Sequence, residues 1–199
     1  MARRSEHSPE QIKTMLLDAA ELVVNEQGFS ALKARSIAKD IGYTVGSLYM
    51  VFNNMPDLIM QLHARTLDAI VLHLQQSPFN ESKARMESLA LAYMNYGVQH
   101  FNRWRFIFDD RLLADAEIPD WYQNKIDKLT HQFELCLASL KPELDPLEIK
   151  HNAFALFAGI QGICALSIKP NLDKDEFEKV EATIITLVRH FMQGIKIQS

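Results

Sequence analysis

The sequence predicts an all-α fold of about nine helices. Apolar residues recur at helical spacing along most of the chain, and no stretch of any length alternates as a β-strand would. Only 7 Gly and 7 Pro interrupt the 199 residues, which favours long helices. With 48% hydrophobic and 23% charged residues, the composition is that of a globular protein and not of a disordered one.

The N-terminal residues predict a compact module of three helices. Ser8, Pro9 and Gln11 form a helix-start signature, in which the serine caps the helix and the glutamine follows three positions later. This first helix is expected to end at about Gln27, because Gly28 follows. Its expected buried residues are Ile12, Leu16, Ala19, Ala20 and Val23.

Residues 33–52 have the pattern of a helix-turn-helix. Gly42, between two short amphipathic helices, can adopt the positive φ at which a helix ends, and Thr44 can cap the second helix. The apolar faces comprise Ala34, Ile37, Ala38 and Ile41 in the first helix and Leu48, Val51 and Phe52 in the second. The second helix of such a motif enters the DNA major groove.

The residues expected to face DNA are basic, hydroxylated, small or amphipathic. Basic side chains can neutralise phosphates, hydroxyls can bond to base edges or phosphates, and a valine can touch a thymine methyl. The predicted DNA-binding residues are Lys33, Arg35, Thr44, Val45, Gly46, Ser47, Tyr49 and Met50. The alternative is that Thr44 only caps and Tyr49 only packs. The net charge is −4, but residues 29–55 hold three basic side chains against one acidic, a local charge of +2.

Longer helices are expected in the rest of the chain. Asn54 and Asp57 mark the start of a connecting helix over 56–76. Two further helices are predicted at about 81–101 and 103–113. The next helix opens at Ile118-Pro119-Asp120-Trp121, and two more begin at capping boxes at Asp145 and Asp173.

The last two helices predict a homodimer. The helix after Asp145 is apolar on every side, and the helix after Asp173 carries one long apolar stripe. A chain of this size has difficulty burying both, so we expect them to pair with the same helices of a second subunit. The predicted interface residues are Phe154, Ala158, Gly162, Ala165, Ile184, Val188, Phe191 and Ile195. The alternative is an ordinary monomeric core.

Aromatic residues concentrate between residues 93 and 157 and suggest a largely apolar ligand pocket with a few polar anchors. The candidate ligand-binding residues are Tyr93, Tyr96, His100, Trp104, Phe108, Trp121, Phe154, Phe157 and Gln161. The alternative is that the aromatic side chains fill the core.

Other classes of site find little support. The 7 histidines include no pair at ligand spacing beside a carboxylate or cysteine, so no metal is expected. No glycine-rich phosphate loop and no nucleophile–base pair is present, so neither a cofactor nor an enzymatic activity is expected. The 2 cysteines favour a reduced, cytoplasmic protein, and the most apolar run, 153–168, is too short to span a membrane.

The N-terminal motifs resemble the DNA-binding domain of the TetR (tetracycline repressor) family. The resemblance covers roughly residues 8–70 and rests on Gly28-Phe29, Arg35-x-Ile37-Ala38, Gly42, Gly46-x-Leu48-Tyr49-x-x-Phe52 and Leu58. Two positions depart from the family pattern. Met55 stands where the family commonly has a lysine, and Leu32-Lys33 stands where it commonly has a threonine pair.

The resemblance implies a DNA-binding domain over 8–55 and a helical regulatory domain over 56–199 with a four-helix dimer interface and a ligand pocket. We therefore expect a homodimeric, sequence-specific transcriptional regulator that binds a palindromic operator in double-stranded DNA. Its simplest form is a repressor released by a small, largely apolar effector. The alternatives are an activator, a ligand-independent DNA binder, or a helical carrier or enzyme with a vestigial DNA module.

Overall fold

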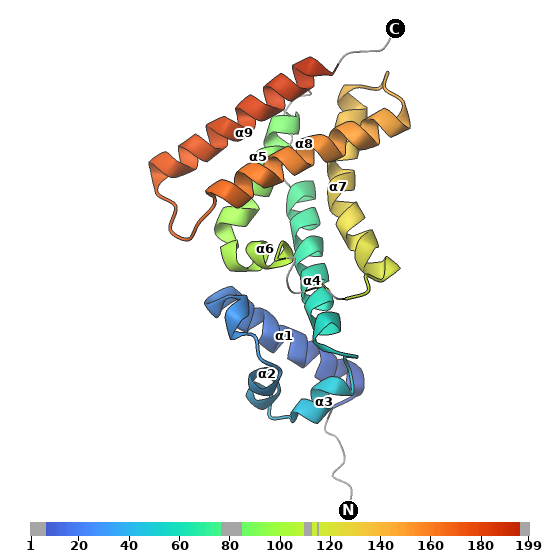
Figure 1. Cartoon of the computed structure of the whole chain (residues 1–199), viewed down its shortest axis with the longest axis vertical. Coiled ribbons are helices and arrows are strands. Elements are labelled where there is room, and N and C mark those ends of the chain that lie inside the picture. The colour runs from blue at the N-terminus through green and yellow to red at the C-terminus, as the bar shows by residue number, and fades with distance from the viewer. Residues whose placement is uncertain (1–6, 77–84, 110–112, 115, 196–199) are drawn as a thin grey trace, which may run out of the picture. The chain divides into compact units, whose positions relative to one another are not determined.

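The structure, a computed structural model, describes residues 7–76, 85–109, 113–114 and 116–195 (Figure 1). Over these residues the chain forms nine α-helices and one short 3-10 helix, with no strand. The predicted all-α fold class is confirmed. The elements are α1 (Pro9–Gln27), η1 (Phe29–Ala31), α2 (Ala34–Asp40), α3 (Val45–Tyr49), α4 (Met55–Gln76), α5 (Arg85–Gln99), α6 (Phe101–Ile107), α7 (Asp120–Leu140), α8 (Pro146–Ser167) and α9 (Lys174–Gly194).

Side-chain caps determine where several helices begin. At α1, Ser8 Oγ accepts a hydrogen bond from the Gln11 backbone N–H at 3.2 Å. In return, Gln11 Oε1 accepts one from the Ser8 N–H at 2.7 Å. The reciprocal arrangement recurs at Asp145 before α8 and at Asp173 before α9. Each capping box satisfies N–H groups that have no partner inside the helix, so these starts could be predicted from local sequence.

One helix is shorter than predicted. The helix expected over 103–113 is observed as Phe101–Ile107, and the N–H of Phe108 donates to Arg105 O, which closes the last turn. Leu113 lies in a turn beyond the helix and packs against the core of the N-terminal helices. Its apolar character therefore serves tertiary packing and not a longer helix. The residues predicted to begin the preceding helix, 81–84, lie outside the described residues.

The helices divide into two compact units. The first contains the residues up to Thr66 together with 102–122, and the second contains 67–101 together with 123–199. α4 therefore contributes its first half to one unit and its second half to the other. The core of the first unit joins α1, α2, α3, the start of α4 and Phe106 of α6. The functional boundary predicted after residue 55 stays a prediction.

In the second unit, α5 packs against α8 and α9, and α8 packs against α9 (Figure 1). Within the chain α8 is buried on one side only, through Ala153, Leu156, Phe157, Ile160 and Cys164. On its other side, Phe154 is 60% exposed and Leu166 is 90% exposed. Ala158, Gly162 and Ala165 are exposed as well. α8 thus keeps an apolar face that its own chain does not cover.

The predicted interface residues on α9 require a correction. Ile184 and Val188 are 0% and 1% exposed, because this side of α9 packs in the core of the second unit. A side chain without exposed surface cannot contact a second subunit, so these two belong to the core. Phe191 and Ile195 are half-buried and stay in the predicted interface.

Shortening Ile184 to valine tests its placement in the core. We expect Ile184→Val to lower the free energy of unfolding by about 1 kcal/mol, because it removes one buried methylene. Chemical denaturation measures this change, and sedimentation velocity should show an unaltered self-association. Thr183→Ser, at the adjacent exposed position, is the control. A weakened self-association with an unchanged free energy of unfolding would show that Ile184 lies in the interface and not in the core.

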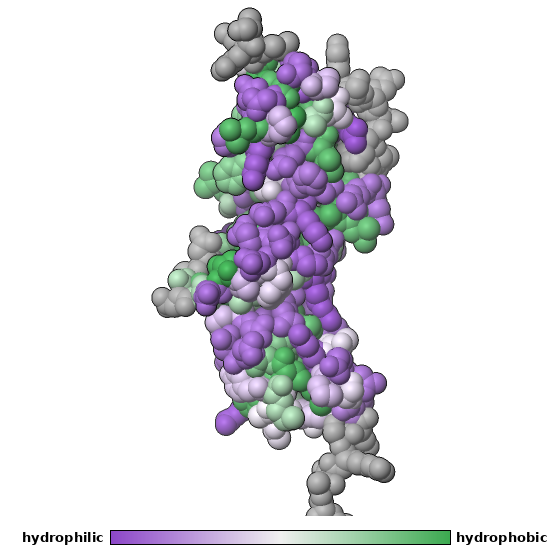
Figure 2. Space-filling model, turned by 90° about the vertical axis from the view of Figure 1, so that its right-hand side faces the viewer, coloured by the Kyte–Doolittle hydropathy of each residue, from purple (hydrophilic) through white to green (hydrophobic). Residues whose placement is uncertain are grey.

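Hydrophilic side chains cover most of the face seen in Figure 2, and hydrophobic ones form separate patches between them. In the described part of the chain, no helix has the length and apolar composition needed to cross a bilayer.

The two cysteines lie inside the second unit as free thiols. Burial raises the pKa of Cys136 to about 11, with the charge of Arg85 acting in the opposite direction. Burial also raises the pKa of Cys164 to about 12. Both are protonated at neutral pH and are therefore weak nucleophiles.

Candidate nucleic-acid interface

The turn between α2 and α3 depends on a glycine. Gly42 has a φ of 77°, and its N–H donates to Lys39 O at 2.9 Å. The next N–H, of Tyr43, donates to Ala38 O at 2.8 Å. A Cβ at position 42 would meet no atom within 4 Å, so the requirement is one of backbone conformation and not of space. Gly42 therefore ends α2 and directs the chain into α3, as predicted.

Thr44 caps α3. Its Oγ1 accepts a hydrogen bond from the Ser47 backbone N–H at 3.3 Å, and the two side-chain hydroxyls lie 3.2 Å apart. Thr44 is exposed and Ser47 is half-buried. A hydroxyl has one donor and two acceptor sites, so capping leaves Thr44 able to bond to a further group.

α3 presents one face to the core and the other to solvent. Leu48 and Phe52 are 0% and 2% exposed, and they anchor the helix and the residues that follow it. Tyr49 and Met50, on the other side, are 48% and 80% exposed. The side chain of Tyr49 therefore lies at the surface and not in the core, and its contact with DNA stays a prediction.

The structure gathers the predicted DNA-binding residues on one module. Each lies in α2, in α3, or directly beside one of these helices. Lys33, Arg35, Thr44, Gly46, Tyr49 and Met50 are exposed, and Val45 and Ser47 are half-buried. Met55, by contrast, packs partly against the core of the first unit. Contact between these residues and DNA stays a prediction.

Two further polar side chains border this module, and sequence reasoning missed them. Lys13 Nζ of α1 lies 5.7 Å from the centroid of the Phe52 ring, which places an ammonium group beside the end of α3. His7 Nδ1 lies 2.8 Å from the Tyr43 hydroxyl, just before the cap of α3. Each pair joins residues far apart in the sequence, so no local pattern could have revealed it.

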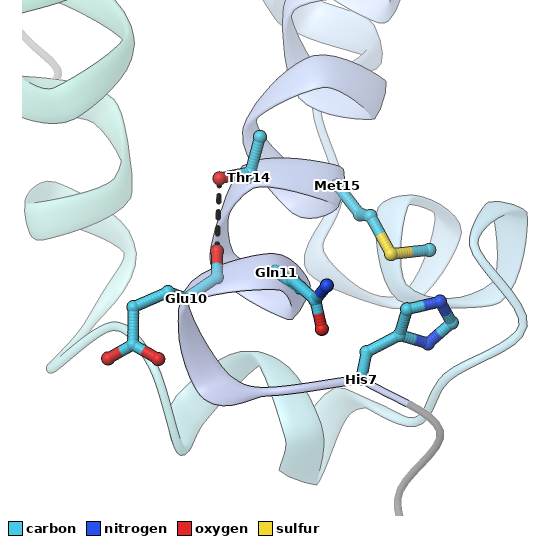
Figure 3. A pocket seen from close by; sticks show the side chains of 5 residues that line it. All are labelled: His7, Glu10, Gln11, Thr14 and Met15. Atoms are coloured by element: carbon cyan, nitrogen blue, oxygen red, sulfur yellow. Dashed lines mark hydrogen bonds between the residues drawn. The ribbon is translucent and has the colours of Figure 1, made fainter.

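An open depression runs along the first turns of α1 (Figure 3). It has a volume of about 400 Å³ and is lined by His7, Glu10, Gln11, Thr14 and Met15. Thr14 Oγ1 donates to Glu10 O at 3.0 Å, and Gln11 is part of the capping box. All the lining residues come from one segment, so the depression is the outer surface of a single helix and not an enclosed site.

The candidate ligand-binding residues are divided between the two units. Trp104, Phe108 and Trp121 belong to the first unit. There Trp104 is 1% exposed and packs on Phe108, with ring centroids 5.6 Å apart. The second unit holds Tyr93, Tyr96, His100, Phe154, Phe157 and Gln161.

Within the second unit, Tyr93 is the centre of one polar and aromatic group. Its hydroxyl donates to Gln161 Oε1, and its ring meets Phe157 edge-on, with centroids 5.3 Å apart. Tyr93 and Phe157 are buried, so they form part of the core. Phe154 is 60% exposed, so it lies on the surface of the unit and outside this buried group, and its role in ligand binding stays a prediction. A pocket beside Tyr93 and Gln161 stays a prediction.

Tyr96 lies between two histidines of the second unit. The ring centroids of Tyr96 and His100 are 4.6 Å apart, and those of Tyr96 and His73 are 5.6 Å apart. Tyr96 is buried whereas His100 is exposed. These two candidate ligand-binding residues are therefore neighbours, with Tyr96 inside the unit and His100 at its surface.

His63 of α4 is buried in the first unit. Its Nδ1 lies 2.8 Å from the Tyr122 hydroxyl, and its ring meets Phe106 edge-on, with centroids 4.3 Å apart. Burial lowers the pKa of His63 to about 4, and the backbone of Phe106 opposes this shift. Burial also raises the pKa of Tyr122 to about 12. Both side chains are neutral at pH 7, and their hydrogen bond joins α4 to the start of α7.

The neutral His63 should make folding stability depend on pH. In the unfolded chain a histidine takes up a proton near pH 6.5, whereas folded His63 does so only near pH 4. The unfolded state therefore binds more protons in this window, so the free energy of unfolding decreases as the pH falls through it. Between pH 7 and pH 5 we expect His63 to account for a loss of about 1–2 kcal/mol.

Urea unfolding of the wild type and of His63→Gln at pH 7 and pH 5 measures how much of the loss of stability is due to His63. The glutamine keeps a group able to bond to Tyr122 but does not titrate, so the variant should lose less stability than the wild type. An identical pH dependence in both proteins would contradict the burial of a neutral His63.

Among the residues that the structure describes, no group of three or more His, Cys, Asp or Glu side chains is arranged to hold a metal ion.

Known proteins match part of the chain in sequence and most of it in fold. Residues 16–62 match the family model described as bacterial regulatory proteins, tetR family. No protein of curated function matches the chain in sequence.

Solved structures resemble the chain over most of its length. A protein of unknown function from Rhodococcus sp. RHA1 has a TM-score of 0.72 at 16% identity, covering 98% of this chain and 100% of its own. The TetR family transcriptional regulator PfmR from Thermus thermophilus has a TM-score of 0.62 at 14% identity, and the likeness covers 87% of this chain and 97% of PfmR. The multidrug binding protein EbrR, complexed with imidazole, has a TM-score of 0.57 at 21% identity, and the likeness covers 88% of this chain and 93% of EbrR. At these identities the likeness is one of fold.

Proposed function

The chain belongs to the tetR family of bacterial regulatory proteins, and from this we propose that it is a homodimeric repressor released from a palindromic operator by a small molecule. As a member of that family it is a DNA-binding transcriptional regulator. The observation that carries the proposal is the amphipathic α3, anchored by Leu48 and Phe52 and exposing Tyr49 and Met50. The repressor role, the operator and the effector are the proposed steps beyond membership.

The exposed residues of α2 and α3 supply the chemistry that a duplex requires. Lys33 and Arg35 can pair with phosphates at the edge of the groove, and the Tyr49 hydroxyl can reach a phosphate. Thr44 and Ser47 offer hydroxyls, and Val45 offers a methyl surface for thymine. Lys13 adds a cation near the end of α3, where Met55 packs against the core and offers none.

The uncovered face of α8 supports a homodimer. Phe154, Ala158, Gly162 and Ala165 lie three or four residues apart, so these exposed positions follow one side of the helix. A Cβ added at Gly162 would meet no atom of its own chain within 4 Å, so the space above it is open to a partner helix. To bind a palindromic operator, such a dimer must hold its two α3 helices about 34–36 Å apart, in successive major grooves.

The proposed effector site lies in the second unit beside Tyr93, Phe157 and Gln161, where a hydrogen-bonding group adjoins aromatic rings. EbrR, which shares this fold, is a multidrug binding protein, and this supports a small-molecule effector for the present chain. An effector can shift the DNA-binding equilibrium only by its difference in affinity for the two states. We propose that this difference acts through α4, since that helix contributes to both units.

One experiment tests the regulatory proposal. Duplexes bound by the wild type are selected from a random-sequence library, and a panel of small aromatic compounds that includes imidazole is screened for binding. The dissociation constant of the selected duplex is then measured with and without each compound that binds. A higher dissociation constant with the compound supports induction, and equal values for every binder reject it.

Two rival functions make different predictions. An activator or ligand-independent binder would bind the selected duplex but would not reduce transcription of a reporter placed behind it. A carrier or enzyme with a vestigial DNA module would bind compounds from the panel and would select no common DNA sequence.

A further inference from the structure

An ion-pair cluster ties three helices of the first unit together. Glu21 of α1 is at its centre, with Oε2 lying 3.2 Å from Nη1 of Arg65 in α4. Its other oxygen, Oε1, lies 2.8 Å from Nη1 of Arg103 in α6. Asp18 Oδ1 is 2.6 Å from the same nitrogen of Arg65. Two carboxylates thus balance two guanidinium groups, and Glu21 bridges α4 and α6.

Arg103 makes a second contact that fixes its direction. Its Nε donates to Thr66 Oγ1 of α4 at 3.0 Å, and the Thr66 hydroxyl donates to Leu62 O at 3.2 Å. Thr66 is 2% exposed, and the side chain of Arg103 is 18% exposed. The planar guanidinium donates in fixed directions, so Arg103 holds Glu21 and Thr66 in a defined geometry, which a lysine ammonium cannot do.

Neighbouring contacts attach α6 to the same end of α1. Asn102 Nδ2 donates to Asn25 O at 2.9 Å. Phe106 stacks on Phe29, with ring centroids 5.2 Å apart. α6 is thus part of the unit that contains the helix-turn-helix, although it follows that motif in sequence only after α4 and α5.

We propose that Arg103 is a positioning residue for DNA binding. It joins α6 and α4 to Glu21 on α1, and α1 packs directly on α3. The cluster therefore fixes the angle at which α4 leaves the helix-turn-helix. Because α4 continues into the unit that carries α8 and α9, this angle sets the separation of the two α3 helices in a dimer. The inference rests on the proposed homodimeric DNA binding.

The test compares two duplexes taken from the wild-type selection, one with both half-sites and one with a single half-site. Arg103→Gln should raise the dissociation constant of the two-half-site duplex about tenfold. The same variant should change the dissociation constant of the single-half-site duplex less than about twofold, because each α3 still docks normally. The salt dependence should be unchanged, since Arg103 neutralises no phosphate.

Three further variants sharpen the comparison. Glu21→Gln should reproduce the selective loss, because it removes the acceptor that bridges both arginines. Arg103→Lys should show it too, although the charge is kept, because the two-directional geometry is lost. Lys128→Gln, at an exposed position of α7, removes one positive charge and should leave both dissociation constants unchanged.

Several outcomes would overturn the proposal. They are an equal loss on both duplexes, no loss on either, full activity of Arg103→Lys, or a fall of about 0.9 in the salt slope per subunit. Circular dichroism during heating shows that each variant is folded at the assay temperature. If Arg103→Gln does not fold, Glu21→Gln and Arg103→Lys carry the same test. A wild type that binds neither duplex contradicts the proposed function instead.

Discussion

Replacing Tyr49 with alanine is expected to weaken binding to the selected two-half-site duplex about 100-fold. The substitution removes a contact worth about 1.4 kcal/mol from each half-site, which raises the dissociation constant about tenfold. Because the dimer loses this contact at both half-sites, the two losses multiply. Tyr49 is 48% exposed, so its truncation leaves the anchoring residues Leu48 and Phe52 in place. Fluorescence anisotropy at fixed salt measures the dissociation constant, and circular dichroism verifies that the helical content is unchanged.

A matched variant separates loss of contact from general damage. Leu22→Ala shortens a side chain of the same unit that is 57% exposed and lies outside α2 and α3. It should bind DNA like the wild type. If Tyr49→Ala also bound normally, α3 would not be the DNA-contacting helix. The variant should still bind any compound from the effector panel that the wild type binds.

Replacing Gly162 with leucine is expected to raise the dissociation constant of the homodimer about 100-fold or more. The added side chain meets nothing within 4 Å of its Cβ in its own chain, so the subunit should fold normally. Where two α8 helices pair closely, the leucine side chain would be overpacked. This would weaken the association by about 1–3 kcal/mol at each site, and the dimer contains two such sites. Sedimentation velocity over a concentration series measures the association. DNA affinity should fall with it, because a single subunit reaches only one half-site.

Two comparisons make the Gly162 result specific. Asn124→Leu introduces the same side chain at an exposed position of α7 and should leave the association unchanged. Phe154→Glu, which places a charge on the uncovered face of α8, should dissociate the dimer in the same way as Gly162→Leu. A dimer that tolerates both α8 variants would show that its interface lies on another surface.

Local chemistry made much of the fold predictable from sequence. The capping boxes at Ser8, Asp145 and Asp173 each act within four residues, so their residue types alone marked the helix starts. Gly42 and Thr44 identified the helix-turn-helix for the same reason. The burial of α3 on one face followed from the spacing of its apolar residues.

Tertiary contacts explain what the sequence did not reveal. The apolar stripe of α9 was correctly located, but its pattern does not distinguish packing against α5 from packing against a second subunit, and Ile184 belongs to the former. Leu113 resembled the end of a helix, although it is apolar because it packs on the N-terminal core. The Glu21–Arg103 pair joins α1 to α6, far apart in the chain, so no local pattern could indicate it.

The mass of the protein–DNA complex tests the central claim most directly. Free protein at micromolar concentration should sediment at twice the 22.8 kDa mass of the chain. With a selected duplex whose half-site centres are one helical turn apart, it should form a complex of two subunits per duplex. The claim is contradicted if the protein stays at 22.8 kDa and no duplex, even at low salt, increases its mass.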